Sequence, residues 1–163
     1  KNDLYLAVLR NACRDATQHL DDLGNDQEAL AARLQQFARV HLENLLEHGQ
    51  VARLMLRELL SDNPRHGQEL AEQVYGEKFS RFVAILRAGQ QAGELRSNID
   101  PAMVATVLIG ANVFFFESRA ALHHFPDVSF TQQPERYSTM LADILLHGIL
   151  PPHSATTRNR NRT

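Results

Sequence analysis

The chain has 163 residues, of which 44% are hydrophobic and 22% are charged, a composition typical of a soluble globular protein of one domain. Its net charge of −2 provides no general attraction to nucleic acid or to anionic lipid. The single cysteine, Cys13, excludes an intramolecular disulfide and a thiolate metal cluster, which fits a reducing cytoplasmic setting.

The chain opens with KNDLYLAVLRNACRDATQHL, whose apolar spacing predicts an amphipathic helix. The apolar stripe of this helix comprises Tyr5, Leu9, Ala12, Cys13, Ala16, Leu20 and Leu23. Because Cys13 lies on the stripe, we expect its thiol to be a small buried hydrophobic group. The helix starts at the first residue, so we expect a further segment to precede Lys1.

Two helices are predicted after Gly24. The first has apolar residues at steps of three and four, and Gly49 ends or bends it. Its stripe contains Leu30, Leu34, Phe37, His41 and Leu45. The second, residues 51–60, is apolar nearly all round, which predicts a short helix surrounded by others. Asp62-Asn63-Pro64 stops it.

A long helix is predicted from about Gly67 to Ala92, with Gly93 as a left-handed C-cap. Asp100 and Pro101 then have the chemistry of an N-cap and a first helical position. A loop over 123–134 leads to a last helix with one apolar face, which Pro151-Pro152 terminate. The sequence therefore predicts an all-α bundle of about six helices in residues 1–150, followed by a disordered basic tail, residues 151–163.

The helix that begins at Pro101 lacks a polar face. Between residues 102 and 116 only Thr106 and Asn112 are polar, and the stretch falls short of the roughly 18 residues of a membrane span. A bundle helix normally keeps one face in water, so we expect this helix to bury one face in its own domain and another against a second copy. The expected dimer interface is a four-helix contact formed with the last helix, comprising Val107, Gly110, Val113, Phe114, Tyr137, Met140, Leu141 and Ile144. A fully buried central helix in a monomer is the alternative.

No motif typical of an enzyme is present: no Gly-rich phosphate loop, no G-x-S-x-G, no H-E-x-x-H and no inward Glu-x-x-His pair. We therefore expect no enzymatic activity, no cofactor and no bound metal. His41 and His48 lie two helical turns apart, which is a poor spacing for a shared metal. His41 is either a core histidine with one hydrogen-bond partner or a polar group in an apolar cavity.

Aromatic and methionine side chains from several helices would converge in the interior, either as packed core or as the lining of a cavity. His41, Asn112 and Arg119 lie on or beside apolar stripes, and each needs a partner if it is buried, which a ligand would supply. The candidate effector pocket comprises Phe37, His41, Met55, Tyr75, Phe79, Phe82, Asn112, Phe115 and Arg119. Such a lining suits a small, largely apolar or aromatic effector.

Two segments resemble TetR-family transcriptional regulators. KNDLYLAVL is similar to the junction where the family's helix-turn-helix domain ends in a phrase like F-x-N-K-x-x-L and a long connecting helix starts. ILRAGQQAGELRSNIDPAMVATVLIGAN resembles the family's passage between its seventh and eighth helices. The resemblance extends to about Leu150 and implies the ligand-binding and dimerisation domain of a repressor, with a DNA-binding domain of three short helices preceding Lys1.

By this resemblance, Leu4 to Asp21 is the connecting helix that a bound effector tilts. Tilting changes the spacing of the two recognition helices and releases operator DNA. Lys1 matches the family lysine that commonly faces an operator phosphate, and no membrane partner is expected. A lipid-binding accessory protein with a TetR-like bundle and no DNA binding is the alternative function, and a metal-dependent bundle enzyme is disfavoured.

Overall fold

The computed structural model describes residues 20, 23–24, 28–60, 68 and 71–147. These residues form five α-helices and no strand, which confirms the predicted all-α fold. The helices are α3 (Leu30–Glu47), α4 (Gly49–Leu59), α6 (Gly76–Gln91), α7 (Pro101–Leu122) and α8 (Pro134–His147). A π-helical turn, η1 (Ala71–Tyr75), runs directly into α6, and a 3₁₀ turn, η2 (Phe130–Gln132), precedes α8.

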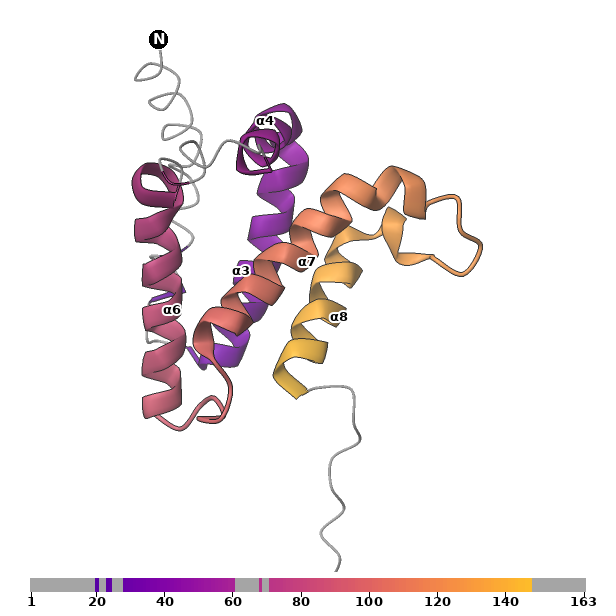
Figure 1. The fold of residues 1–163 in the computed structure, drawn as a ribbon. Helices are drawn as coiled ribbons and strands as arrows, with labels where there is room; N and C mark the ends of the chain where they lie inside the picture. The colour runs from indigo at the N-terminus through magenta and orange to yellow at the C-terminus, as the bar shows by residue number, and fades with distance from the viewer. Residues whose placement is uncertain (1–19, 21–22, 25–27, 61–67, 69–70, 148–163) are drawn as a thin grey trace, which may run out of the picture.

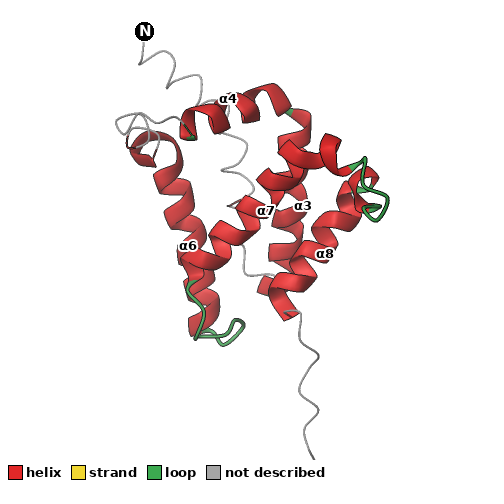
Figure 2. Cartoon of the chain, turned by 45° about the vertical axis from the view of Figure 1, so that its right-hand side comes forward, coloured by secondary structure: helices red, strands yellow, loops and turns green. Residues whose placement is uncertain are grey.

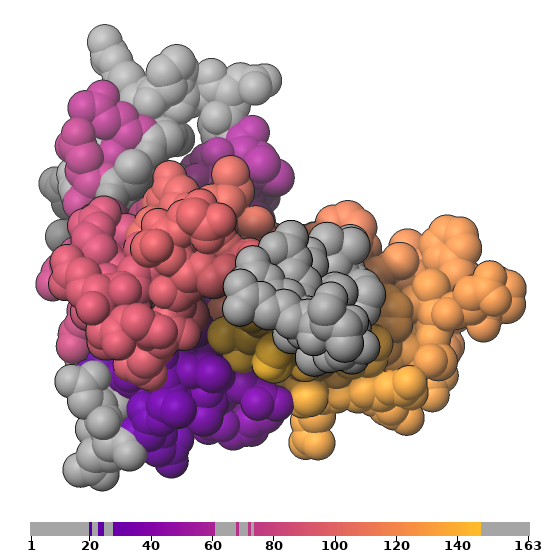
Figure 3. Space-filling model, turned by 90° about the horizontal axis from the view of Figure 1, so that it is seen from below, coloured from indigo at the N-terminus to yellow at the C-terminus, as the bar shows by residue number. Residues whose placement is uncertain are grey.

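Helix α7 crosses α3 at the centre of the fold, with α6 on one side and α8 on the other (Figure 1). Helix α4 turns away from the end of α3 towards the start of the η1–α6 segment (Figure 2). The segment that joins α7 to α8 projects to one side of the bundle, as the view from below also shows (Figure 3). The most extensive contacts between α-helices, those of α3 with α8, α3 with α7 and α6 with α7, all involve α3 or α7.

The apolar interior consists of two clusters. The main core lies where α3, α6 and α7 meet, and includes Leu34, Phe37, Ala38, Phe82, Leu86, Ala105 and Leu108. A second cluster joins Met55 of α4 to Val74 of η1. We call these the main core and the second cluster.

Local sequence signals set several helix ends. The Asp100 side chain accepts a hydrogen bond from the Ala102 amide at 2.8 Å, with Pro101 at the first helical position, as predicted. Gly93 has a φ of 78°, the left-handed conformation predicted for a C-cap. The turn that Gly93 makes also orients Glu94, whose Oε2 accepts a hydrogen bond from the Leu30 amide at 2.8 Å, at the N-terminus of α3.

Gly49 stands at the corner between α3 and α4, where the sequence predicted that the helix ends or bends. A Cβ atom added to Gly49 would lie 3.3 Å from the ring of Phe116. Glycine therefore lets this corner approach α7 closely, which brings α4 beside the C-terminal half of α7.

Helix α7 has two apolar faces. Its buried side chains are Ala105, Leu108, Asn112, Phe115 and Phe116. A second set, Met103, Val107, Gly110 and Phe114, is exposed, and we call it the α7 stripe. At about 100° per residue the two sets lie roughly half a turn apart. Helix α7 has 22 residues, and its most apolar window has a mean hydropathy of 1.5. By length and composition alone the whole helix could cross a membrane, whereas the stretch 102–116 is too short to do so.

Candidate functional site

Asn112 of α7 and His41 of α3 form a polar pair inside the bundle. Asn112 is completely buried, and its Nδ2 donates to the Ala38 carbonyl at 2.8 Å and lies 3.0 Å from His41 Nδ1. Because Nδ2 has two hydrogens to donate, a neutral His41 accepts at Nδ1 and keeps its own hydrogen on Nε2. Asn112 Oδ1 has no partner among the described residues, and an unsatisfied buried acceptor typically costs about 1–3 kcal/mol.

Aromatic side chains surround this pair. The Phe37 ring is nearly parallel to that of His41, with centroids 5.8 Å apart, and tilts against Phe82 at 4.6 Å. Phe79 packs against the same main core from α6. The structure therefore brings together five of the nine residues predicted for the effector pocket: Phe37, His41, Phe79, Phe82 and Asn112.

Two further predicted pocket residues, Met55 and Tyr75, belong to the second cluster. Tyr75 is the last residue of η1 and precedes Phe79 by one turn on the continuous η1–α6 segment. The second cluster therefore lies one helical turn from the main core along the η1–α6 segment. The predicted pocket residues belong partly to the main core and partly to the second cluster.

Phe115 lies in a different contact, between α7 and α8. Its ring stacks on Tyr137 with centroids 4.0 Å apart, and both rings approach Phe130 of η2. The Tyr137 hydroxyl donates to the Ala111 carbonyl at 2.7 Å, and burial raises the pKa of Tyr137 to about 12. Phe115 and Tyr137 thus join α7 to α8, where the sequence had assigned one to the pocket and the other to the dimer interface.

The other residues predicted for the dimer interface lie towards the outside of α7 and α8. Val107, Phe114, Met140 and Ile144 are 42–65% exposed, values that are unusual for large apolar side chains. Gly110 is exposed between the first two on the α7 stripe, whereas Val113 and Leu141 are half-buried. Both helices therefore present exposed apolar side chains of the kind that a partner would cover.

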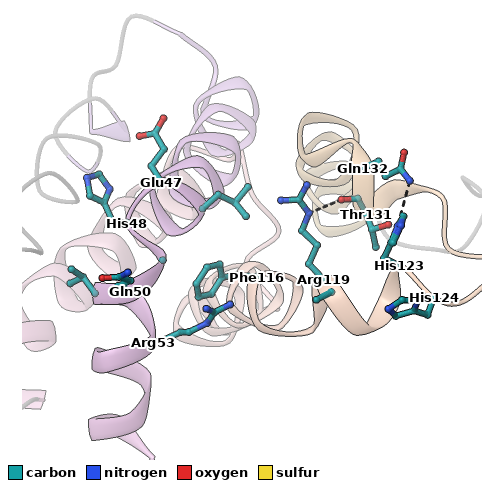
Figure 4. Close-up of a pocket in the computed structure, with 14 residues that line it drawn as sticks. Glu47, His48, Gln50, Arg53, Phe116, Arg119, His123, His124, Thr131 and Gln132 are labelled. Carbon is teal, nitrogen blue, oxygen red and sulfur yellow. Dashed lines mark hydrogen bonds between the residues drawn. The ribbon is translucent and has the colours of Figure 1, made fainter.

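A cleft of about 1120 Å³ lies between the α3–α4 corner, the C-terminal half of α7 and η2 (Figure 4). It is lined by Leu46, Glu47, His48, Gly49, Gln50, Val51, Arg53, Phe116, Arg119, Ala120, His123, His124, Thr131 and Gln132. Arg119 is the one predicted pocket residue among them, and its Nε donates to the Thr131 carbonyl at 2.7 Å. Arg53 lies over the Phe116 ring, 5.3 Å from the centroid, with its Nε 3.4 Å from a Glu117 carboxylate oxygen.

Sequence reasoning missed Phe116, Arg53 and Thr131 as cleft residues. Thr131 is 2% exposed, and its Oγ1 has no hydrogen-bond partner in the described part of the chain. Thr131 lies outside the predicted helices, so no helical periodicity could identify it. Phe116 is one of three consecutive phenylalanines, and the helical pattern does not define which of them faces the cleft. A threonine directly before Gln132-Gln133-Pro134 was the available hint of a structured turn.

The histidines occupy varied positions. His48 Nδ1 lies 3.3 Å from the Asn44 carbonyl oxygen, and His123 Nδ1 lies 3.4 Å from Gln132 Nε2. Within the described ranges, no three His, Cys, Asp or Glu side chains converge as a metal site would need. Lys1, Cys13, the basic tail and the connecting helix apart from Leu20 are outside the described residues, so the predictions made for them stay predictions.

Comparisons with known proteins agree on one family. Residues 25–121 match the family described as tetracyclin repressor-like, C-terminal domain. The fold is similar to the crystal structure of a transcriptional regulator of the TetR/AcrR family from Thermobifida fusca YX-ER1, with a TM-score of 0.63 and 15% identity. The alignment covers 92% of this chain and 75% of that one. No curated protein matches the sequence.

Proposed function

The chain belongs to the family of tetracyclin repressor-like C-terminal domains, and on that premise we propose that it is the ligand-sensing and dimerisation domain of a cytoplasmic TetR-like repressor. A small, largely apolar or aromatic effector binds in the helical core. Binding shifts the domain towards a state in which the DNA-binding part of the full-length regulator no longer holds its operator. The family match and the resemblance of the opening segment support this proposal.

The observation that carries the proposal is the presence of two opposite apolar faces on α7. Asn112 on the inner face contacts Ala38 and His41 of α3. The α7 stripe on the outer face is exposed and therefore available to a second protomer. A ligand that changes the contacts of Asn112 acts on the same rigid helix that carries the dimer surface. Helix α7 therefore connects the interior of the domain to the proposed subunit interface. Such a connection is needed if a ligand is to change the spacing of the two DNA-binding domains of a dimer.

We place the effector between the main core and the second cluster. Phe79 and Phe82 contribute aromatic surface on one side, and Met55 and Tyr75 contribute apolar surface on the other. The unsatisfied Oδ1 of Asn112 suits a hydrogen-bond donor on the effector. Phe115 and Arg119 contact Tyr137 and Thr131 instead, so our proposal does not include them in this site.

The apolar fluorophore 1-N-phenylnaphthylamine tests the site in the 163-residue chain. We expect saturable binding with one molecule per chain, weakened about tenfold or more by Tyr75→Ala, because the variant removes about 2 kcal/mol of apolar contact. Phe125→Ala is the matched control, since Phe125 is an exposed aromatic residue on the α7–α8 connection. Unsaturable binding, or equal effects of the two variants, would refute the core site.

The regulatory half of the proposal needs the complete natural protein. A ligand that displaces the fluorophore should also lower the protein's affinity for DNA from the region upstream of its own gene, measured by fluorescence anisotropy. A reading frame without a helix-turn-helix, together with lipid recovered by solvent extraction of the purified protein, would instead support the lipid-binding alternative.

A further inference from the structure

We propose that the cleft beside Arg119 binds a small organic carboxylate, at a site separate from the apolar effector site of the core. The cleft has the volume of a small-molecule site and is formed by three segments distant in sequence: the α3–α4 corner, the end of α7, and η2 (Figure 4). Nothing in the family assignment requires a polar site at this position.

The charge of the cleft favours an anion. Arg53 and Arg119 are the arginines of the lining, and Glu47 is its single carboxylate. Arg53 is paired with Glu117, its Nε lying 3.4 Å from a carboxylate oxygen, so Arg119 is the positive charge available to an anion. Figure 4 shows the Glu47 carboxylate pointing away from Arg119 and Phe116. In the described part of the chain, no carboxylate forms an ion pair with Arg119, so this guanidinium lacks a counter-charge.

The geometry of Arg119 favours a carboxylate. Its Nε is used by the Thr131 carbonyl at 2.7 Å, which fixes the plane of the guanidinium and leaves the two terminal nitrogens as donors. Two such donors match the two oxygens of a carboxylate in a bidentate pair. Thr131 lines the same cleft, and its Oγ1 is buried without a partner among the described residues. A rotation of this side chain would bring the hydroxyl to the bound anion as a donor.

The neighbouring surface favours an organic anion over an inorganic one. Leu46, Val51 and Ala120 line the cleft with partly or fully accessible apolar surface, and the Phe116 ring beside them is 7% exposed. Arg53 covers one face of that ring. A flat apolar body attached to the carboxylate would bury this surface while the acid group reaches Arg119.

The site is compatible with the dimer surface. Phe116, Arg119 and Ala120 lie roughly half a turn from the α7 stripe at about 100° per residue. A carboxylate in the cleft therefore leaves the outer face of α7 uncovered, and binding does not require dissociation.

Benzoate and its neutral isostere benzamide test the proposal in the 163-residue chain by isothermal titration calorimetry. We expect benzoate to bind about tenfold or more tightly than benzamide, since hydrogen bonds to charged groups discriminate at that level. Inorganic sulfate should bind more weakly than benzoate because it buries none of the apolar surface of the cleft.

Arg119→Gln should weaken benzoate binding about tenfold or more and leave binding of 1-N-phenylnaphthylamine in the core unchanged. Arg57→Gln is the matched control, because Arg57 is an exposed arginine one turn beyond Arg53 on α4 and does not line the cleft. If Arg119→Gln does not fold, Thr131→Val decides, since it removes a hydroxyl that makes no hydrogen bond within the described residues.

Weaker benzoate binding in Arg119→Gln, or in Thr131→Val if Arg119→Gln does not fold, would confirm the site, provided that Arg57→Gln binds benzoate as tightly as the wild type. The variant that is used for this comparison is called the decisive variant. Equal binding of benzoate and benzamide, sulfate binding as tight as benzoate, or a decisive variant that behaves like the wild type would overturn it. Because the fluorophore reports on the core separately, loss of the carboxylate site and loss of the proposed effector site are distinguishable.

Discussion

Phe114→Ser is the substitution that most directly tests the proposed dimer. Phe114 is 65% exposed on the α7 stripe. Full burial of a phenylalanine contributes about 1.5–3 kcal/mol, so covering the exposed part contributes about 1–2 kcal/mol in each protomer. In a two-fold symmetric dimer both copies of Phe114 are buried, so together they contribute about 2–4 kcal/mol to the free energy of association. Since about 1.4 kcal/mol is a factor of ten, the dimer dissociation constant should rise between about 30-fold and about 700-fold.

Two companion variants separate association from folding. Phe125→Ser removes a phenylalanine that is 58% exposed but lies beyond α7, away from the stripe, and should leave association unchanged. Gly110→Asp places a charge at the middle of the stripe, where an added Cβ would meet nothing within 4 Å of the single chain. The aspartate should therefore leave the folded protomer intact and oppose only its pairing.

Sedimentation equilibrium over a wide range of protein concentration measures the dissociation constants, and circular dichroism confirms that each variant is helical. The reasoning fails if the wild-type chain is a monomer at micromolar concentration. It also fails if Phe114→Ser and Phe125→Ser change the dissociation constant by similar factors, because the stripe would then contribute no more than any exposed aromatic residue.

Three further predictions concern stability. Asn112→Leu removes the unsatisfied Oδ1, and this gain should offset the loss of the donor to the Ala38 carbonyl and His41, so the free energy of unfolding in urea should change by less than about 1 kcal/mol. Asn112→Ala also leaves a cavity and should lower it by about 2 kcal/mol or more. Tyr137→Phe loses the bond to the Ala111 carbonyl and should lower the stability by about 1 kcal/mol at neutral pH. Because burial raises the pKa of Tyr137 from 10.0 to about 12, its neutral form stabilises the fold below pH 10 and this contribution disappears as the pH rises through 12. Thermal melts across that alkaline range should show the decline in the wild type and not in Tyr137→Phe. Asp100→Ala should cost about 1 kcal/mol through loss of the cap on the Ala102 amide, while Asp100→Asn keeps the cap and should melt close to the wild type.

The helix ends were predictable because their signals are local. Asp100 and Pro101 start α7, and Gly93 ends the preceding helix in a left-handed conformation, through chemistry that involves only a few neighbouring residues. The break at Gly49 is of the same kind. The close approach of Phe116 to that corner has no local signal and emerges only from the packing of α7.

The rotation of α7 was not predictable from its sequence. A helix with one polar face has its orientation fixed by that face, but α7 is apolar on both sides. Its three consecutive phenylalanines consequently point in different directions: Phe114 to solvent, Phe115 to Tyr137, and Phe116 to the α3–α4 corner. The pattern predicted that two faces exist, but it did not define which of the three phenylalanines lies on which face.

The candidate site was predictable only where it lies on helical stripes. Phe37, His41 and Phe82 follow regular spacing and meet in the main core. Tyr75 lies in η1, a π turn whose hydrogen bonds span one residue more than those of an α-helix, so a regular helical period does not define whether Val74 or Tyr75 points inward. In the structure Val74 is the buried one.

The apolar surface of α7 admits more than one partner by composition, and its geometry discriminates between them. A helix that spans a lipid bilayer alone would present apolar side chains in every direction, but the inner face of α7 is occupied by α3, with Asn112 donating to the Ala38 carbonyl. What remains exposed is the α7 stripe, together with Met140 and Ile144 of α8. A set of exposed apolar side chains on two neighbouring helices, with a glycine among them, matches the flat surface of another helix pair rather than the acyl chains of a membrane. A second copy of α7 and α8 supplies such a pair, and the dissociation constants of the stripe variants measure whether it does.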